Sequence, residues 1–177
     1  MKKLLLIMII VLACCSCGAD KPDKVEINIV EGEWRHSHND YRAEYTIYDA
    51  LEAGCQILEY DIIYAHGAVY VTHDNEFYDS PLTYFGELTE YLEEIEEVVT
   101  EYRIKLYVYL EVKSRHSLKE PLYKVLSAHT HESIQYLPED WNSEFAVDFI
   151  DSYGDELNLV QYRDFAQGKN IIDLDVY

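Results

Sequence analysis

Three short stretches between residues 36 and 74 decide the fold predicted for this chain. They read H-S-H-N-D-Y at 36–41, L-E-Y-D-I-I-Y at 58–64 and V-Y-V-T-H-D at 69–74. An amphipathic segment separates the first two stretches, and a glycine turn separates the last two. Histidines and carboxylates stand at or near the ends of the predicted strands, where the functional groups of α/β folds collect. We therefore expect an α/β fold with a site at these strand ends.

The rest of the chain alternates between strand and helix signals. Strands are predicted at 34–38, 56–64, 68–73, 103–113, 157–162 and 170–176, and helices at 43–53, 87–102, 117–128 and 139–153. The segment 103–113 alternates strictly, with its aliphatic side chains on one face and Tyr107, Tyr109, Glu111 and Lys113 on the other. Repeated strand–helix units predict a parallel sheet covered by helices, which either stays open or curls into a barrel.

Length and charge limit the classes of function. The chain has 177 residues, enough for one domain, whereas a closed eight-stranded barrel typically takes about 250 residues. The formal net charge of −20 argues against binding to nucleic acid or to anionic lipid headgroups, because both require clustered Lys and Arg. A small anionic substrate remains compatible with this charge if a metal ion or local cations attract it.

The first residues have the pattern of a bacterial export signal. Lys2 and Lys3 precede the apolar run 4–12, and the Val11-Leu12-Ala13-Cys14 sequence resembles a lipobox. This predicts a lipoprotein signal peptide at 1–13, a lipid anchor at Cys14 and a polar tether at 14–30, so that the protein is extracytoplasmic and membrane-anchored. The alternatives are Cys15 or Cys17 as the lipidated residue, and an ordinary signal peptide. The domain then spans 31–177.

Glu59 and Asp61 form a carboxylate pair on one face of the strand 56–64. Two carboxylates inside a sheet are costly unless a cation pairs with them. Glu111 adds a third carboxylate on another strand, and an oxygen donor set of this kind favours Mg²⁺ or Ca²⁺ over Zn²⁺. Cys55 is the only cysteine outside the leader, so a thiolate zinc site is excluded. The alternative is that Glu59 and Asp61 face solvent on an edge strand.

Histidines and a lysine accompany these carboxylates. His38 and His73 are predicted at the ends of neighbouring strands and could act as general acid and base. Lys113 could neutralise an oxyanion or hold Glu111 and Asp61 in place. His36 has the same strand parity as His38 and is an alternative to it as the catalytic residue.

The order of these residues resembles the glycerophosphodiester phosphodiesterase family, within the superfamily of phospholipase-C-like phosphodiesterases. The matching pieces are His38, the E-x-D of Glu59 and Asp61, the H-D at 73–74 and the E-x-K of Glu111 and Lys113. The opening H-S-H-N-D-Y resembles a divergent branch of that superfamily, in place of the usual H-R-G. The resemblance covers residues 34–113.

The resemblance implies a fold and a mechanism. The fold would be a (β/α) TIM-type barrel, here truncated or incomplete at the C-terminus. Glu59, Asp61 and Glu111 would hold Ca²⁺ or Mg²⁺, and His38 and His73 would be the acid–base pair. The substrate would be a glycerophosphodiester or a related phospholipid headgroup.

Two other functions remain open. The H-x-H of His36 and His38 also resembles the opening of amidohydrolase-like metal barrels, which would need further ligands such as His129 and His131. A surface lipoprotein could instead use a catalytically inactive barrel as a binding module, with tyrosines lining a groove.

Overall fold

A computed structural model describes residues 26–30, 32–38, 41, 46–73, 83–114, 117–140 and 144–174. The predicted signal peptide, Cys14 and most of the tether lie outside these residues, as does Asp74. Within the described part of the chain, no helix is both long enough and apolar enough to cross a membrane.

The elements follow one another as strand and helix. In order they are β1 (Trp34–Ser37), α1 (Ile47–Glu52), β2 (Ile57–Ala65), β3 (Ala68–Val71), β4 (Gly86–Glu87), α2 (Leu88–Tyr102), β5 (Leu106–Val112), α3 (Lys119–Ala128), β6 (Ile134–Glu139), α4 (Glu144–Tyr153), α5 (Tyr162–Ala166) and β7 (Ile171–Leu174). The alternating burial predicted for 103–113 is confirmed in β5, where every second side chain from Leu106 to Val112 is buried.

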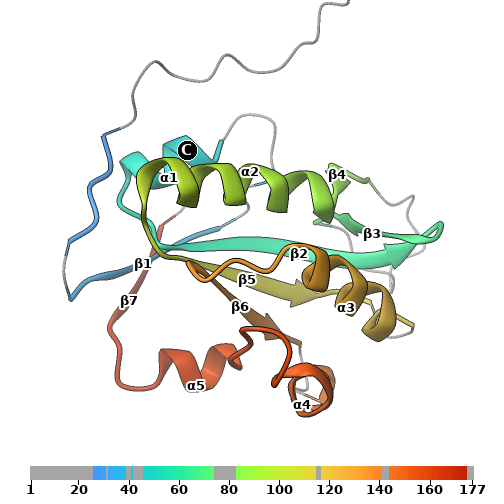
Figure 1. Cartoon of the computed structure of the whole chain (residues 1–177). Coiled ribbons are helices and arrows are strands. Elements are labelled where there is room, and N and C mark those ends of the chain that lie inside the picture. Colours follow the sequence, from blue (N-terminus) through green and yellow to red (C-terminus); the bar gives the residue numbers. More distant parts are fainter. Residues whose placement is uncertain are drawn as a thin grey trace, which may run out of the picture.

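All the described strands belong to one mixed sheet (Figure 1). β2 is its central strand and pairs in parallel with β1 and β5, while β3 pairs with it in antiparallel fashion through the turn at His66 and Gly67. β7 continues the sheet beyond β1, and β6 continues it beyond β5, both in parallel. The short strand β4 pairs with β3 in antiparallel fashion.

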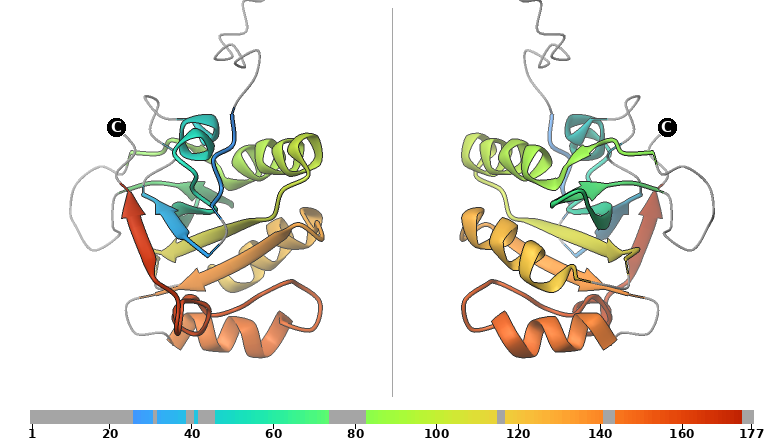
Figure 2. Two further views of the ribbon diagram at one scale, coloured as in Figure 1. Left: turned by 90° about the vertical axis from the view of Figure 1, so that its left-hand side faces the viewer. Right: turned by 90° about the vertical axis from the view of Figure 1, so that its right-hand side faces the viewer.

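The prediction of a (β/α) TIM-type barrel is wrong, because the sheet stays open and is mixed. β6 and β7 do not pair with each other; the chain between them forms α4 and α5 instead (Figure 2). The predicted strand at 157–162 is reduced to one bridge between Tyr136 and Leu159, and Tyr162 already begins α5. β6 lies outside the strands predicted from the sequence, because its Pro138 disfavours a strand assignment.

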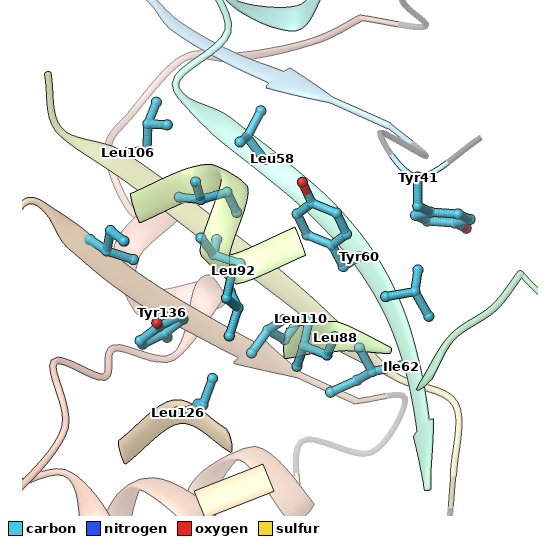
Figure 3. Packing of buried hydrophobic residues seen from close by; sticks show 14 of the residues in the cluster. Tyr41, Leu58, Tyr60, Ile62, Leu88, Leu92, Leu106, Leu110, Leu126 and Tyr136 are labelled. Carbon is cyan, nitrogen blue, oxygen red and sulfur yellow. The ribbon is translucent and has the colours of Figure 1, made fainter. Parts of the chain in front are cut away.

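The two faces of the sheet are covered differently. The helix face carries Leu58, Tyr60 and Ile62 of β2 and packs against α1, α2, α3 and α4 in one core (Figure 3). The opposite face, which we call the site face, carries Ile57, Glu59 and Asp61. Strand periodicity separates the two sets, because successive side chains point to opposite faces.

A small second core covers part of the site face. Phe165 of α5 packs there with Ile57 and Leu137, and its ring lies 5.1 Å from Trp34 and 4.7 Å from Tyr107, measured between ring centroids. In a closed barrel, side chains from further strands would fill this face. Here α5 supplies the apolar cover, which explains how an open sheet keeps its inner residues buried.

Phe165→Ala is expected to lower the free energy of unfolding by about 3 kcal/mol, because it removes a buried aromatic ring and leaves a cavity. Urea unfolding followed by circular dichroism measures the change. Val147→Ala on the exposed side of α4 is the matched control, with an expected change within about 0.5 kcal/mol. Equal stabilities of the two variants would contradict a structural role for α5.

Candidate active site

The register of the strands collects the polar residues of the site face. Asp61 of β2 lies beside Glu111 of β5, and His36 of β1 lies beside Asp173 of β7. Alternation brings Glu59 onto the same face as Asp61, two residues along the strand. Four adjacent parallel strands, β7, β1, β2 and β5, therefore carry Asp173, His36, Glu59, Asp61 and Glu111.

Glu59 is the centre of the first group of contacts. Its Oε2 lies 2.7 Å from His38 Nδ1 and 3.2 Å from His36 Nε2. On their other edges, the two imidazoles face Asp173 Oδ1, at 3.3 Å from His36 Nδ1 and 3.6 Å from His38 Nε2. The two histidines differ in burial: the His36 side chain is 4% exposed and that of His38 is 33% exposed.

Asp61 is the centre of the second group. The Tyr41 hydroxyl donates a hydrogen bond of 2.7 Å to Asp61 Oδ2, and His73 Nδ1 lies 3.2 Å from the same oxygen. Tyr41 also approaches His73 Nδ1, at 3.3 Å. The His73 side chain is 55% exposed, so Asp61 anchors one edge of a ring whose remainder reaches solvent.

Lys113 neutralises part of this acidic cluster. Its Nζ lies 2.6 Å from Glu111 Oε1 and 3.3 Å from Asp61 Oδ1. Burial opposes the charged form of Lys113, but the hydrogen bond to Glu111 and the charge of Asp61 outweigh it and raise its pKa. Lys113 therefore stays an ammonium ion.

The surroundings shift the pKa values of Glu59 and Glu111 in opposite directions. Burial acts to raise the pKa of Glu59, but the contacts with His36 and His38 prevail and lower it to about 2. Burial and the nearby charge of Asp61 raise the pKa of Glu111, even though Lys113 opposes the change. One ammonium ion between two carboxylates leaves an excess of negative charge, which a further cation would relieve.

The donor atoms at this position fit a hard divalent cation. Glu59, Asp61 and Glu111 each offer a carboxylate oxygen within 4.8 Å of the others. Asp61 Oδ1 is buried and has no hydrogen-bond partner, although Lys113 lies near it. An acceptor left in this state is costly, and oxygen ligands of this kind suit Mg²⁺ or Ca²⁺. A second group that could hold a metal ion consists of His36, His38 and Glu59.

The structure brings all the residues predicted for catalysis and metal binding onto one face of the sheet: His38, His73, Lys113, Glu59, Asp61 and Glu111. Their roles stay predictions. The suggestion that Glu59 and Asp61 face solvent is wrong, because both are buried. His129 does not join His36 and His38; it ends α3 and contacts Glu96 of α2, at 3.3 Å.

Sequence reasoning did not assign a role to three residues that contact this site. Tyr41 is the last residue of the H-S-H-N-D-Y motif, so its place in the motif could have indicated that it belongs to the site. Asp173 is one acidic residue in a strand that the sequence pattern predicts only weakly. The pairing of β7 with β1 in the structure reveals its contacts. Tyr162, whose hydroxyl lies 3.4 Å from His36 Nδ1, carries no sequence signal at all.

Comparison with protein-family models assigns a family to part of the chain. A family model described as an AIM6-like phosphodiesterase domain matches residues 26–117. This span covers 92 of the 177 residues and contains both histidine–carboxylate groups except Asp173. Searches of curated proteins and of solved structures found no match.

Proposed function

This chain belongs to the AIM6-like phosphodiesterase domain family, and on that premise we propose that it is a metal-dependent hydrolase of phosphoric diesters. The observation that carries the proposal is the convergence of Glu59, Asp61 and Glu111, each within reach of a single cation. His38 contacts Glu59 and His73 contacts Asp61. The proposed ligands of the cation therefore also orient the imidazoles that would transfer protons.

The metal-binding residues would be Glu59, Asp61 and Glu111. A bound Ca²⁺ or Mg²⁺ supplies positive charge that neutralises the phosphate and orients the diester. Lys113 adds a permanent positive charge from the side of Glu111. Together these charges overcome the repulsion that a protein of net charge −20 would otherwise exert on an anionic substrate.

His38 is the better candidate than His36 for proton transfer. We assign the proton of His38 to Nδ1, which donates to Glu59 over 2.7 Å, so that Nε2 carries the lone pair. The side chain of His38 is one-third exposed and can reach a substrate, whereas His36 is enclosed by the sheet and by Tyr162. His38 is therefore our candidate for the acid or the base.

His73 has a comparable arrangement at the other end of the site. Its Nδ1 contacts Asp61 and its ring is more than half exposed, which leaves Nε2 available. In the reaction, one imidazole takes the proton from a water molecule, or from a neighbouring hydroxyl of the substrate, as the oxygen attacks phosphorus. The other imidazole protonates the alcohol oxygen as its bond to phosphorus breaks.

We infer that the substrate is a small diester of the glycerophosphodiester or phospholipid-headgroup class. The resemblance of the motif order to glycerophosphodiester phosphodiesterases supports this choice. The protein would meet such substrates outside the cytoplasm if Cys14 carries the predicted lipid anchor.

The proposal is tested by incubating the purified protein with bis(p-nitrophenyl) phosphate and with glycerophosphocholine, with added Ca²⁺ or Mg²⁺. We expect release of p-nitrophenol or of choline, measured by absorbance or by a coupled assay, and loss of turnover on chelation. The matched control is the double variant His38→Ala, His73→Ala. Turnover of the wild type no greater than that of the double variant, on both substrates and with both metals, would refute the proposed activity.

A further inference from the structure

His36 is buried against the site but takes no part in the proposed proton transfers. Its Nε2 is buried and forms no regular hydrogen bond, and Glu59 Oε2 lies 3.2 Å away as an ion-pair contact. A buried ring nitrogen that forms no regular hydrogen bond loses part of the free energy of its hydration. Coordination of a metal ion beside Glu59 would offset this loss, and His36 belongs to a residue group that could hold one.

The rings of His36 and His38 lie next to each other in a tilted arrangement, with their centroids 4.6 Å apart and their planes 30° apart. One edge of this pair, formed by His36 Nε2 and His38 Nδ1, faces Glu59. The opposite edge, formed by His36 Nδ1 and His38 Nε2, faces Asp173. Two imidazoles therefore lie between two carboxylates that come from different strands.

This arrangement can present two nitrogen lone pairs to one point. A neutral imidazole carries one N–H group, and the negative charge of Asp173, 3.3 Å from His36 Nδ1 and 3.6 Å from His38 Nε2, favours the tautomer with the proton on those nitrogens. The lone pairs of His36 Nε2 and His38 Nδ1 then lie 3.2 Å and 2.7 Å from Glu59 Oε2, and the three residues each offer one ligand atom within 4.8 Å of the others. A carboxylate that holds the far nitrogen of a ligating histidine is a recurrent feature of zinc sites.

We propose that His36, His38 and Glu59 bind Zn²⁺, with Asp173 as the positioning residue for both imidazoles. Two nitrogen ligands and one carboxylate suit Zn²⁺ and discriminate against Mg²⁺ and Ca²⁺, which take oxygen ligands. This zinc site is distinct from the group formed by Glu59, Asp61 and Glu111, although the two share Glu59.

The zinc site has a consequence for the proposed enzyme. Zn²⁺ at His38 Nδ1 places the proton of that ring on Nε2 and also occupies Glu59, so His38 can no longer accept a proton through Nε2. Zn²⁺ therefore inhibits the phosphodiesterase. This consequence rests on the proposed function, whereas the binding of Zn²⁺ does not.

The test is calorimetric titration of the full chain with Zn²⁺ in the absence of substrate. We expect a site whose affinity falls about 10- to 100-fold in Asp173→Asn, because the amide accepts hydrogen bonds more weakly than the carboxylate. His36→Gln and His38→Gln each remove a ligand and should weaken binding at least as much. His38 is partly exposed, so its variant remains informative if the buried substitution impairs folding, which circular dichroism reports.

Glu111→Gln separates the two sites. It should weaken binding of Ca²⁺ while leaving the affinity for Zn²⁺ unchanged, because Glu111 belongs only to the carboxylate group. Long-range ¹H–¹⁵N spectra of the imidazoles should show Zn²⁺ shifting His36 Nε2 and His38 Nδ1, a readout that a structural role of Asp173 alone would not produce. The zinc site is overturned if the histidine variants and Asp173→Asn bind Zn²⁺ as the wild type does, or if only Glu111→Gln loses it. Neither result depends on phosphodiesterase activity.

Discussion

His38→Ala is expected to lower kcat for a phosphodiester by about 100- to 10,000-fold, the range that one positioned general acid or base contributes. His38 is anchored to Glu59 through Nδ1 and is one-third exposed, so alanine removes the proton-transferring group without emptying the core. Because the substrate would still meet the carboxylates and Lys113, we expect KM to change far less than kcat.

Steady-state kinetics on bis(p-nitrophenyl) phosphate measure this loss, with His66→Asn as the matched control. His66 lies at the exposed turn between β2 and β3 with φ of 50°, a conformation that asparagine tolerates. His36→Gln provides the second comparison, and we expect it to reduce kcat less than His38→Ala does. A larger loss in His36→Gln than in His38→Ala would reverse the roles of the two histidines.

Asp61→Asn is expected to abolish stimulation by Ca²⁺ or Mg²⁺ and to lower kcat/KM by about 1,000-fold, or about 4 kcal/mol. Asparagine has nearly the same shape and can still accept the hydrogen bond from Tyr41, so the fold should survive. The charge is lost at the point where His73, Lys113 and the proposed cation meet. The variant therefore removes electrostatic stabilisation rather than packing.

Two titrations with Ca²⁺ or Mg²⁺ measure the effect of Asp61→Asn. One follows the activity and the other follows metal binding by calorimetry. Asp151→Asn, on the exposed surface of α4, makes the same chemical substitution away from the site and should retain wild-type values. If Asp61→Asn kept the metal dependence of the wild type, the proposed cation ligands would be wrong.

The site residues could be predicted because they are encoded locally. The E-x-D of β2 and the E-x-K around the end of β5 each place polar groups on one face of a strand by alternation alone, and parallel pairing in register then sets Asp61 beside Glu111. The order of the motifs adds His38 and His73. The inferences about the carboxylates and Lys113 need only strand periodicity and the adjacency of β2 and β5, whereas those about the histidines rest on the resemblance of the motif order.

The barrel could not be excluded in the same way. Whether a parallel sheet closes depends on what the chain does between its outer strands, here β6 and β7. The apolar pattern of 157–162 is compatible with a strand, but in the structure Tyr162 and Phe165 enter a helix and cover the site face. The segment could either pair with the edge of the sheet as a strand or pack on the site face as a helix. Tertiary contacts decide between the two, so the local sequence pattern does not.

The sequence by itself determined the parity of the strands and, with it, the identity of the carboxylates and histidines that share a face. Only the tertiary structure decided that the sheet stays open, that His36 is buried while His38 is not, and that Asp173 reaches both rings from β7. The physical reason is range: alternation acts between neighbouring residues, whereas burial and strand pairing depend on segments more than 130 residues apart, such as β1 and β7.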